Sequence, residues 1–145
     1  MGIVQDFART FNARDVAGLV GLFTEAGSYH DGFFGPHAGR AQLAVMFERM
    51  FREGRDYDWR MDTVVETPER AAAEWTFGYV VTEAVPRSAG RRVQLRGMSL
   101  FELEAGRIRA YRECFDTGVA LLQLGFEPSA IAKVLGRRVP DAVGR

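Results

Sequence analysis

Two carboxylates set among aromatic residues are the side chains of this sequence best suited to acid–base chemistry. Asp31 lies in an aromatic loop that follows an apolar segment, and Glu113 lies between Tyr111 and Phe115 on one face of an expected strand. Burial in such surroundings raises the pKa of a carboxyl group toward the range in which it transfers protons near neutral pH. These surroundings make Asp31 and Glu113 the candidate catalytic residues of the sequence.

Each carboxylate also has a purely structural interpretation. Asp31 precedes Gly32, where an aspartate commonly caps a turn with its own side chain. Glu113 could instead form a buried ion pair with an arginine such as Arg96 or Arg109. The residue pattern alone leaves these alternatives open.

Several other residues are predicted to contact a ligand held by these carboxylates. Tyr29 shares strand parity with Asp31, so its hydroxyl can donate to that carboxylate or to a ligand oxygen, although a half-buried strand aromatic is the simpler interpretation. Ser99 can donate one hydrogen bond from another strand. The remaining candidates for an apolar lining are Phe7, Phe33, Trp59 and Tyr111.

The two histidines do not indicate a metal centre. His30 has the opposite strand parity to Asp31, and His37 lies in a loop beside Pro36. Their spacing across a strand and a loop matches no familiar ligand pattern. We predict neither a metal nor a cofactor.

Helical periodicity dominates the first third of the chain. Apolar residues recur at i, i+3, i+4 and i+7 over residues 3–11, and a second such stripe follows Asp15, which can cap that helix. Gly27 is predicted to end the second helix, a short strand covers residues 28–31, and a third helix stops at Gly54 after an aromatic loop.

Alternation with a period of two follows. It predicts strands over residues 57–65 and 70–83 and a hairpin over residues 91–116 closed at Gly106. A bulge at Gly78 would switch parity within the second of these strands, so its inward face stays open. Short helices are expected after the hairpin.

These elements predict an α+β fold in which a curved antiparallel sheet wraps around three N-terminal helices and forms a cone with one open end. The chain is expected to be a single domain, 1–145, with residues 117–145 as a helical tail. Such a cone provides the apolar interior with a few inward polar groups that small-molecule sites need.

Composition excludes several classes of function. The 145 residues carry 19 basic and 19 acidic side chains without a block of either sign, which disfavours nucleic acid and anionic membranes as partners. EPSAIAKVLGRR faintly resembles a helix of a helix-turn-helix, but an ordinary docking helix explains its apolar stripe better. A single cysteine, Cys114, and the lack of a secretory signal or a membrane-spanning run predict a cytoplasmic protein.

Residues 3–125 resemble the NTF2-like superfamily, in particular its SnoaL-like polyketide cyclase, limonene epoxide hydrolase and ketosteroid isomerase branches. The resemblance rests on FNARDVAGLVGLFTEAGSYHDGFFG and GRRVQLRGMSLFELEAGRIRAYRECFD. It places Asp31 at the proton-shuttling carboxylate of the isomerases, with Phe7 and Ser99 where they have oxyanion donors. Glu113 corresponds to a catalytic aspartate of the hydrolases.

The resemblance also marks departures from each branch. Phe7 cannot donate a hydrogen bond, and Val80 and Thr82 stand where the hydrolases have an Arg-x-Asp pair. The general SnoaL-like pattern therefore fits best, and it implies a small hydrophobic ligand handled by an isomerase, cyclase or epoxide hydrolase without a cofactor. It also implies a homodimer formed through the outer sheet face that carries Met98 and Leu100. A non-catalytic ligand-binding or dimerisation module on the same fold is the alternative.

Overall fold

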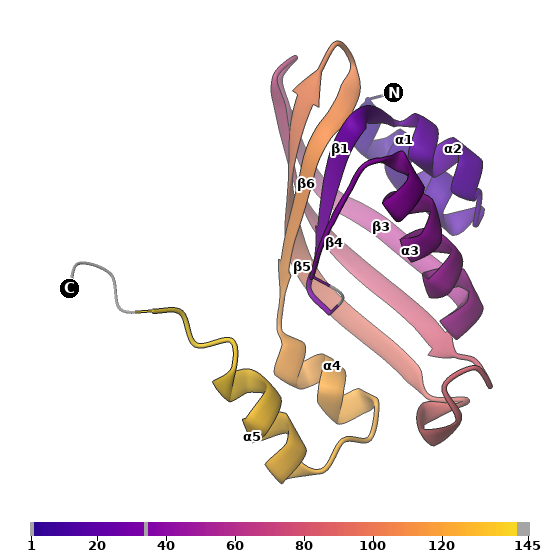
Figure 1. The fold of residues 1–145 in the computed structure, drawn as a ribbon, viewed down its shortest axis with the longest axis vertical. Coiled ribbons are helices and arrows are strands. Elements are labelled where there is room, and N and C mark those ends of the chain that lie inside the picture. Colours follow the sequence, from indigo (N-terminus) through magenta and orange to yellow (C-terminus); the bar gives the residue numbers. More distant parts are fainter. Residues whose placement is uncertain (1, 34, 142–145) are drawn as a thin grey trace.

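The chain folds into a curved six-stranded sheet whose concave face is covered by helices (Figure 1). The computed structural model describes residues 2–33 and 35–141, so the end of the predicted tail, 142–145, lies outside it. Its strands are arranged in the order β2-β1-β6-β5-β4-β3. The elements are α1 (Ile3–Asn12), α2 (Val16–Gly21), β1 (Phe23–Asp31), β2 (Gly35–Ala38), α3 (Arg40–Glu53), β3 (Gly54–Glu66), β4 (Arg70–Val81), η1 (Pro86–Ser88), β5 (Arg92–Glu104), β6 (Arg107–Phe115), α4 (Thr117–Gln123) and α5 (Pro128–Gly136).

The three helices predicted in the N-terminal third are present, but one of their predicted boundaries is wrong. The Asp15 side chain accepts a hydrogen bond from the backbone N–H of Gly18 at 2.9 Å, which confirms it as the cap of α2. The predicted end of this helix at Gly27 is wrong, because α2 stops at Gly21 and β1 begins at Phe23. The apolar stripe continues into the strand, so periodicity did not mark the change.

The sheet contains two pairings that alternation did not reveal. β2 pairs with β1 inside the stretch predicted as a loop, with His37 opposite Tyr29. β1 runs parallel to β6, with Tyr29 opposite Tyr111, which departs from the expected antiparallel arrangement. The first and last strands of the sheet region are therefore neighbours.

The bulge predicted at Gly78 lies in the neighbouring strand instead. The pairing of β4 with β5 is continuous, whereas the register of β3 against β4 shifts between Arg55 and Asp58, where Asp56 has a φ of 54°. Parity along β4 is thus unbroken, and Trp75, Phe77 and Tyr79 all point to the concave side.

The core lies between α1, α3 and the concave face of the sheet. On the opposite face Met98 is 57% exposed. At the wide end of the cone, α4 is fixed to β5 because the Gln123 side chain bonds both the N–H and the C=O of Gln94. α5 has no buried residue and extends away from the body (Figure 1). Within the described residues, none of the helices could cross a bilayer.

Candidate functional site

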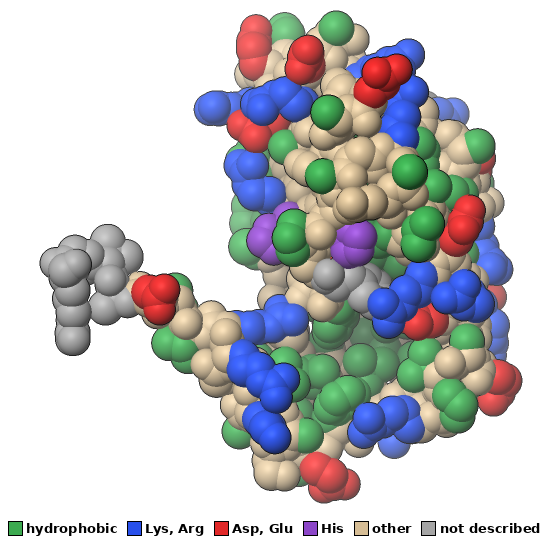
Figure 2. Space-filling view, in the orientation of Figure 1, with side chains coloured by type: hydrophobic (Ala, Val, Ile, Leu, Met, Phe, Trp, Pro, Cys, Tyr) green, Lys and Arg blue, Asp and Glu red, His purple; other side chains and the backbone are tan. Residues whose placement is uncertain are grey.

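A cavity of about 230 Å³ opens at the wide end of the cone. Figure 2 shows it as a hollow with hydrophobic side chains at its base and Lys or Arg side chains along its edges. Aromatic side chains form most of its wall. The lining residues are Phe11, Tyr29, Asp31, Phe33, Met50, Glu53, Tyr57, Trp59, Trp75, Phe77, Tyr79, Val81, Val85, Leu95, Glu113, Phe115 and Leu124.

Asp31 lies at the C-terminal end of β1 and lines this cavity with only 7% of its surface exposed. Its Oδ1 atom accepts a hydrogen bond from the backbone N–H of Phe33 at 2.6 Å. Asp31 therefore caps the turn and lines the cavity at the same time. The cap fixes the orientation of the carboxylate at the cavity wall.

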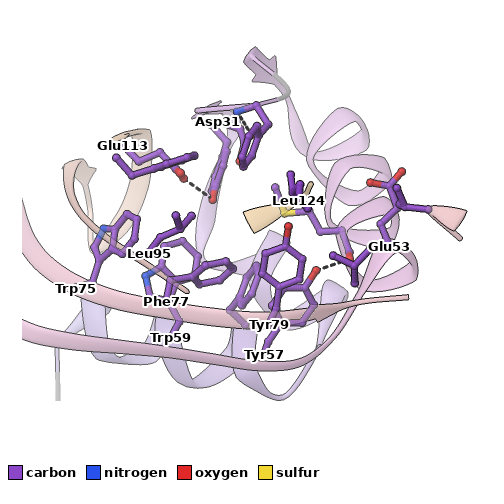
Figure 3. A pocket seen from close by; sticks show the side chains of 17 residues that line it. Asp31, Glu53, Tyr57, Trp59, Trp75, Phe77, Tyr79, Leu95, Glu113 and Leu124 are labelled. Carbon is purple, nitrogen blue, oxygen red and sulfur yellow. Dashed lines mark hydrogen bonds between the residues drawn. The ribbon is translucent and has the colours of Figure 1, made fainter. Parts of the chain in front are cut away.

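Glu113 faces the same cavity from β6 (Figure 3). Its Oε1 atom accepts a hydrogen bond from the Tyr29 hydroxyl at 3.0 Å. Burial, with the negative charge of Asp31 as the second cause, raises the pKa of Glu113 to about 8, and hydrogen bonds from Tyr29, Tyr111 and the Gly32 backbone offset only part of that rise. Glu113 consequently keeps its proton at neutral pH.

The alternative ion pair of Glu113 with an arginine is wrong. Arg109 pairs with Glu102 instead, at 3.3 Å, and Arg96 is exposed on the outer face of the sheet. Phenol hydroxyls rather than guanidinium groups therefore surround this carboxyl group, and their hydrogen bonds do not outweigh the burial that raises its pKa.

Behind Glu113 lies a buried network that joins four side chains. The Tyr29 and Tyr111 rings stack at 4.3 Å, and the Tyr111 hydroxyl is 2.7 Å from the Ser99 Oγ atom. That Oγ atom also accepts a hydrogen bond from Trp75 Nε1 at 2.7 Å. Because an indole N–H only donates, the Ser99 hydrogen remains available for Tyr111. Burial raises the pKa of both tyrosines well above the usual range, so both stay neutral.

The structure separates the predicted ligand contacts into two groups. Tyr29, Phe33 and Trp59 line the cavity. Ser99 and Tyr111 do not line it, because they lie within the network behind the wall. Phe7 does not line the cavity either, because it is fully buried and stacks on Tyr111 at 5.3 Å. The position at which the resemblance to the isomerases placed Phe7 is thus a core position in this chain.

The far side of the cavity carries polar groups that the sequence reasoning missed. The rings of Tyr57 and Tyr79 stack at 5.3 Å with an interplanar angle of 18°. The Tyr57 hydroxyl donates to the Met50 carbonyl, and Glu53 pairs with Arg49 at 3.0 Å. The alternation of aromatic residues along β4 could have identified Tyr79, but nothing in the sequence distinguished Glu53.

Comparison with known proteins identifies the family of this chain and its fold. The family described as the SnoaL-like domain matches residues 4–111. The chain belongs to the SnoaL-like domain family. The fold is that of the NTF2-like superfamily, as the resemblance implied. No curated protein matches this SnoaL-like sequence.

Solved structures agree with the SnoaL-like fold. A hypothetical protein from Catenulispora acidiphila with a ketosteroid isomerase-like fold, in complex with trimethylamine, superposes with a TM-score of 0.76 at 17% identity, over 86% of this chain and 93% of that chain. A putative polyketide cyclase from Pseudomonas putida gives 0.70 at 23% identity, over 85% and 98%. An LEH-like epoxide hydrolase from M. tuberculosis gives 0.70 at 19% identity, over 92% and 93%. At these identities the likeness concerns the fold.

Within this SnoaL-like domain the histidines lie apart from the carboxyl pair. His30 is exposed, and the Nδ1 atom of His37 lies 3.1 Å from the Gly35 carbonyl. Across residues 2–33 and 35–141, no three His, Cys, Asp or Glu side chains are grouped to hold a metal ion. The acid–base groups that line the cavity are the carboxyls of Asp31, Glu113 and Glu53, the last paired with Arg49, and the phenols of Tyr29, Tyr57 and Tyr79.

Proposed function

We propose that this SnoaL-like protein is a cytoplasmic enzyme that moves protons on a small, mostly apolar organic molecule without a cofactor. The reaction would be an isomerisation, a cyclisation or an epoxide opening. The observation that carries this proposal is the pair of carboxyls in one aromatic cavity, with the pKa of Glu113 raised to about 8. A cavity of about 230 Å³ suits a ligand smaller than the drug-sized molecules that occupy roughly 300–1,000 Å³.

The two carboxyls have different roles in this mechanism. Asp31 is the base that takes a proton from a carbon next to a carbonyl or from an attacking water. Glu113 is protonated at neutral pH and is the acid that donates its proton to the oxygen of the ligand. Environments that separate the protonation states of two neighbouring carboxyls are a general way to obtain an acid and a base in one site.

The similar structures support a small-molecule site of this kind. Two of them are described as a putative polyketide cyclase and an LEH-like epoxide hydrolase, and a third holds trimethylamine. Ring closure and epoxide opening both need proton transfer at an oxygen or a carbon, which the Asp31–Glu113 pair can provide.

Deuterium exchange tests the base directly and does not require the natural substrate. Cyclohexanone in D₂O is incubated with the protein, and ¹H NMR follows the loss of the hydrogens next to the carbonyl. Asp31→Asn is expected to lower the exchange rate by about 10²–10⁴-fold, the usual contribution of a general base. Asp58→Asn, on the exposed part of β3, is the control and should exchange at the wild-type rate.

Two results would contradict the proposal. Equal exchange by wild type and Asp31→Asn would exclude Asp31 as the base. Binding of small ketones and epoxides without exchange or ring opening would favour the non-catalytic binding module.

We also propose that the protein is a homodimer that buries the outer face of β5. The exposed side chain of Met98 supports this, because apolar strand surface of this kind commonly marks an interface. Light scattering coupled to size-exclusion chromatography should give twice the 16.2 kDa chain mass, and a monomer mass would refute it.

A further inference from the structure

The hydrogen-bonding groups of the cavity wall are nearly all engaged within the protein. The Tyr29 hydroxyl donates to Glu113, the Tyr57 hydroxyl donates to the Met50 carbonyl, and the Trp75 indole donates to Ser99. Tyr79 differs, because its hydroxyl forms no hydrogen bond with any residue in the described part of the chain. A phenol left in this state has one donor and an acceptor to offer a ligand.

The position of Tyr79 suits this role. Its ring is held between the Tyr57 ring at 5.3 Å and the Phe77 ring at 5.6 Å, which fixes the direction of the hydroxyl. Figure 3 shows this hydroxyl pointing into the cavity from the side opposite Glu113. Burial, with the charges of Glu53 and Asp31, raises the pKa of Tyr79 to about 12, so the hydroxyl keeps its proton throughout the working range.

Apart from the Glu113 carboxyl, the other donors considered for a ligand oxygen are not accessible. Phe7 has no hydroxyl, and Ser99 is occupied by Trp75 and Tyr111. The indole N–H of Trp59 has no hydrogen-bond partner among the described residues, but the nitrogen is fully enclosed by protein atoms. On the side of the cavity opposite the Glu113 acid, Tyr79 is therefore the described donor that an entering ligand can reach.

We propose that Tyr79 determines specificity by binding an oxygen of the ligand, so that the substrate class is a compact oxygenated hydrocarbon rather than a plain hydrocarbon. A ketone, alcohol or ether oxygen would be held by the Tyr79 hydroxyl, and the reacting carbon or second oxygen would lie at Asp31 and Glu113. This inference rests on the proposed function only in taking the cavity as the ligand site. A ligand without such an oxygen would cover the hydroxyl and leave it without a hydrogen bond, which lowers affinity.

Two probes of the same shape isolate this contact. Cyclohexanone and methylenecyclohexane differ by the replacement of an oxygen with a CH₂ group, and quenching of Trp59 and Trp75 in the cavity wall reports the binding of either probe. Wild type is expected to prefer the ketone about tenfold to a hundredfold, the range expected for leaving one buried hydroxyl unpaired. Tyr79→Phe should remove this preference while binding methylenecyclohexane at least as tightly as wild type.

Tyr57→Phe is the matched control, because it removes a hydroxyl from the same stacked pair. Its hydroxyl already donates to Met50, so this variant should keep the preference for the ketone. Retention of the preference in Tyr79→Phe, its loss in both variants, or no preference in wild type would overturn the inference.

The failures of this inference and of the proposed function can be told apart. If Asp31→Asn abolishes exchange while Tyr79→Phe leaves the probe preference intact, the inference fails and the proposed function stands. If Tyr79→Phe removes the preference while Asp31→Asn exchanges normally, the proposed function fails and the inference stands. Binding of neither probe to the wild-type cavity would refute both.

Discussion

Two stacked pairs of tyrosines lie on opposite sides of one cavity, and they differ in what their hydroxyls do. The Tyr29–Tyr111 rings are 4.3 Å apart, and both hydroxyls belong to the network that reaches Glu113 and Ser99. The Tyr57–Tyr79 rings are 5.3 Å apart, and only Tyr57 donates to the protein. Nearly equal ring geometry thus supports a buried structural network in one pair and an open ligand contact in the other.

The difference follows from where the pairs lie in the sheet. Tyr29 and Tyr111 are registered partners on β1 and β6, beneath the fully buried Phe7 of α1. Tyr57 and Tyr79 lie at the wide end of the cone, beside the irregularity of β3 near Asp56. Under α1 only Tyr29 of the first pair reaches the cavity wall, whereas both rings of the second pair line the cavity at the irregular end of β3.

Breaking the buried network at its centre should give the largest change in stability. Ser99→Ala removes the partner of both Trp75 Nε1 and the Tyr111 hydroxyl, and unpaired buried groups of this kind cost about 1–3 kcal/mol. Urea unfolding should therefore show a lower midpoint with an unchanged slope. Ser129→Ala, at an exposed position of α5, is the control and should stay within about 0.5 kcal/mol. A loss below that limit for Ser99→Ala would show that the network contributes little.

The pH dependence of stability should report the state of Glu113. The unfolded chain loses this proton near pH 4.5, whereas the folded protein keeps it until about pH 8. The contribution of Glu113 to stability is therefore complete below about pH 4.5 and is lost as the pH rises to about 8. Glu113→Gln has no proton to lose, so its melting temperature should fall less than that of wild type between pH 5 and pH 9.

Glu104→Gln, at an exposed position near the hairpin turn, provides the comparison and should follow the wild-type curve. Exchange activity should also decline as the pH rises through about 8, because the acid is then deprotonated. Parallel melting curves for wild type and Glu113→Gln would contradict the raised pKa.

Removing one hydroxyl from the Tyr57–Tyr79 pair should have the smallest effect on the free energy of unfolding, and the two variants should differ from each other. Tyr57→Phe loses the hydrogen bond to the Met50 carbonyl and should lower the free energy of unfolding by about 1 kcal/mol. Tyr79→Phe loses no hydrogen bond to the described residues and should change it by less than about 0.5 kcal/mol. Urea titration of both variants distinguishes them, and equal losses would indicate that Tyr79 has a structural role.

Strand parity predicted part of the site from the sequence. It placed Tyr29 with Asp31 on one face of β1 and Glu113 on the inner face of β6, and the structure brings these residues to one cavity. Parity works here because a strand with one buried face fixes the side of every residue. It could not show whether an inward side chain reaches the cavity or lies behind its wall, and Ser99 is the case in point.

The remaining features depend on contacts between distant segments. The parallel pairing of β1 with β6 has no local signal, because β1 is separated from β6 by every other strand in the chain. The irregularity of β3 at Asp56 is equally unmarked, since a non-glycine residue there adopts a positive φ. The role of Tyr79 has no sequence signal either, because only the arrangement of its neighbours shows that its hydroxyl forms no hydrogen bond with the described residues.

The meeting of β1 with β6 also has a consequence for synthesis on the ribosome. The hydroxyl of Tyr29 and the carboxyl of Glu113 are bonded across 84 positions of sequence. During synthesis from the N-terminus, β1 has only β2 beside it until β6 has been made. A growing chain with an unpaired strand edge is prone to pair with the wrong strands. We therefore expect nascent chains stalled before residue 107 to need a chaperone.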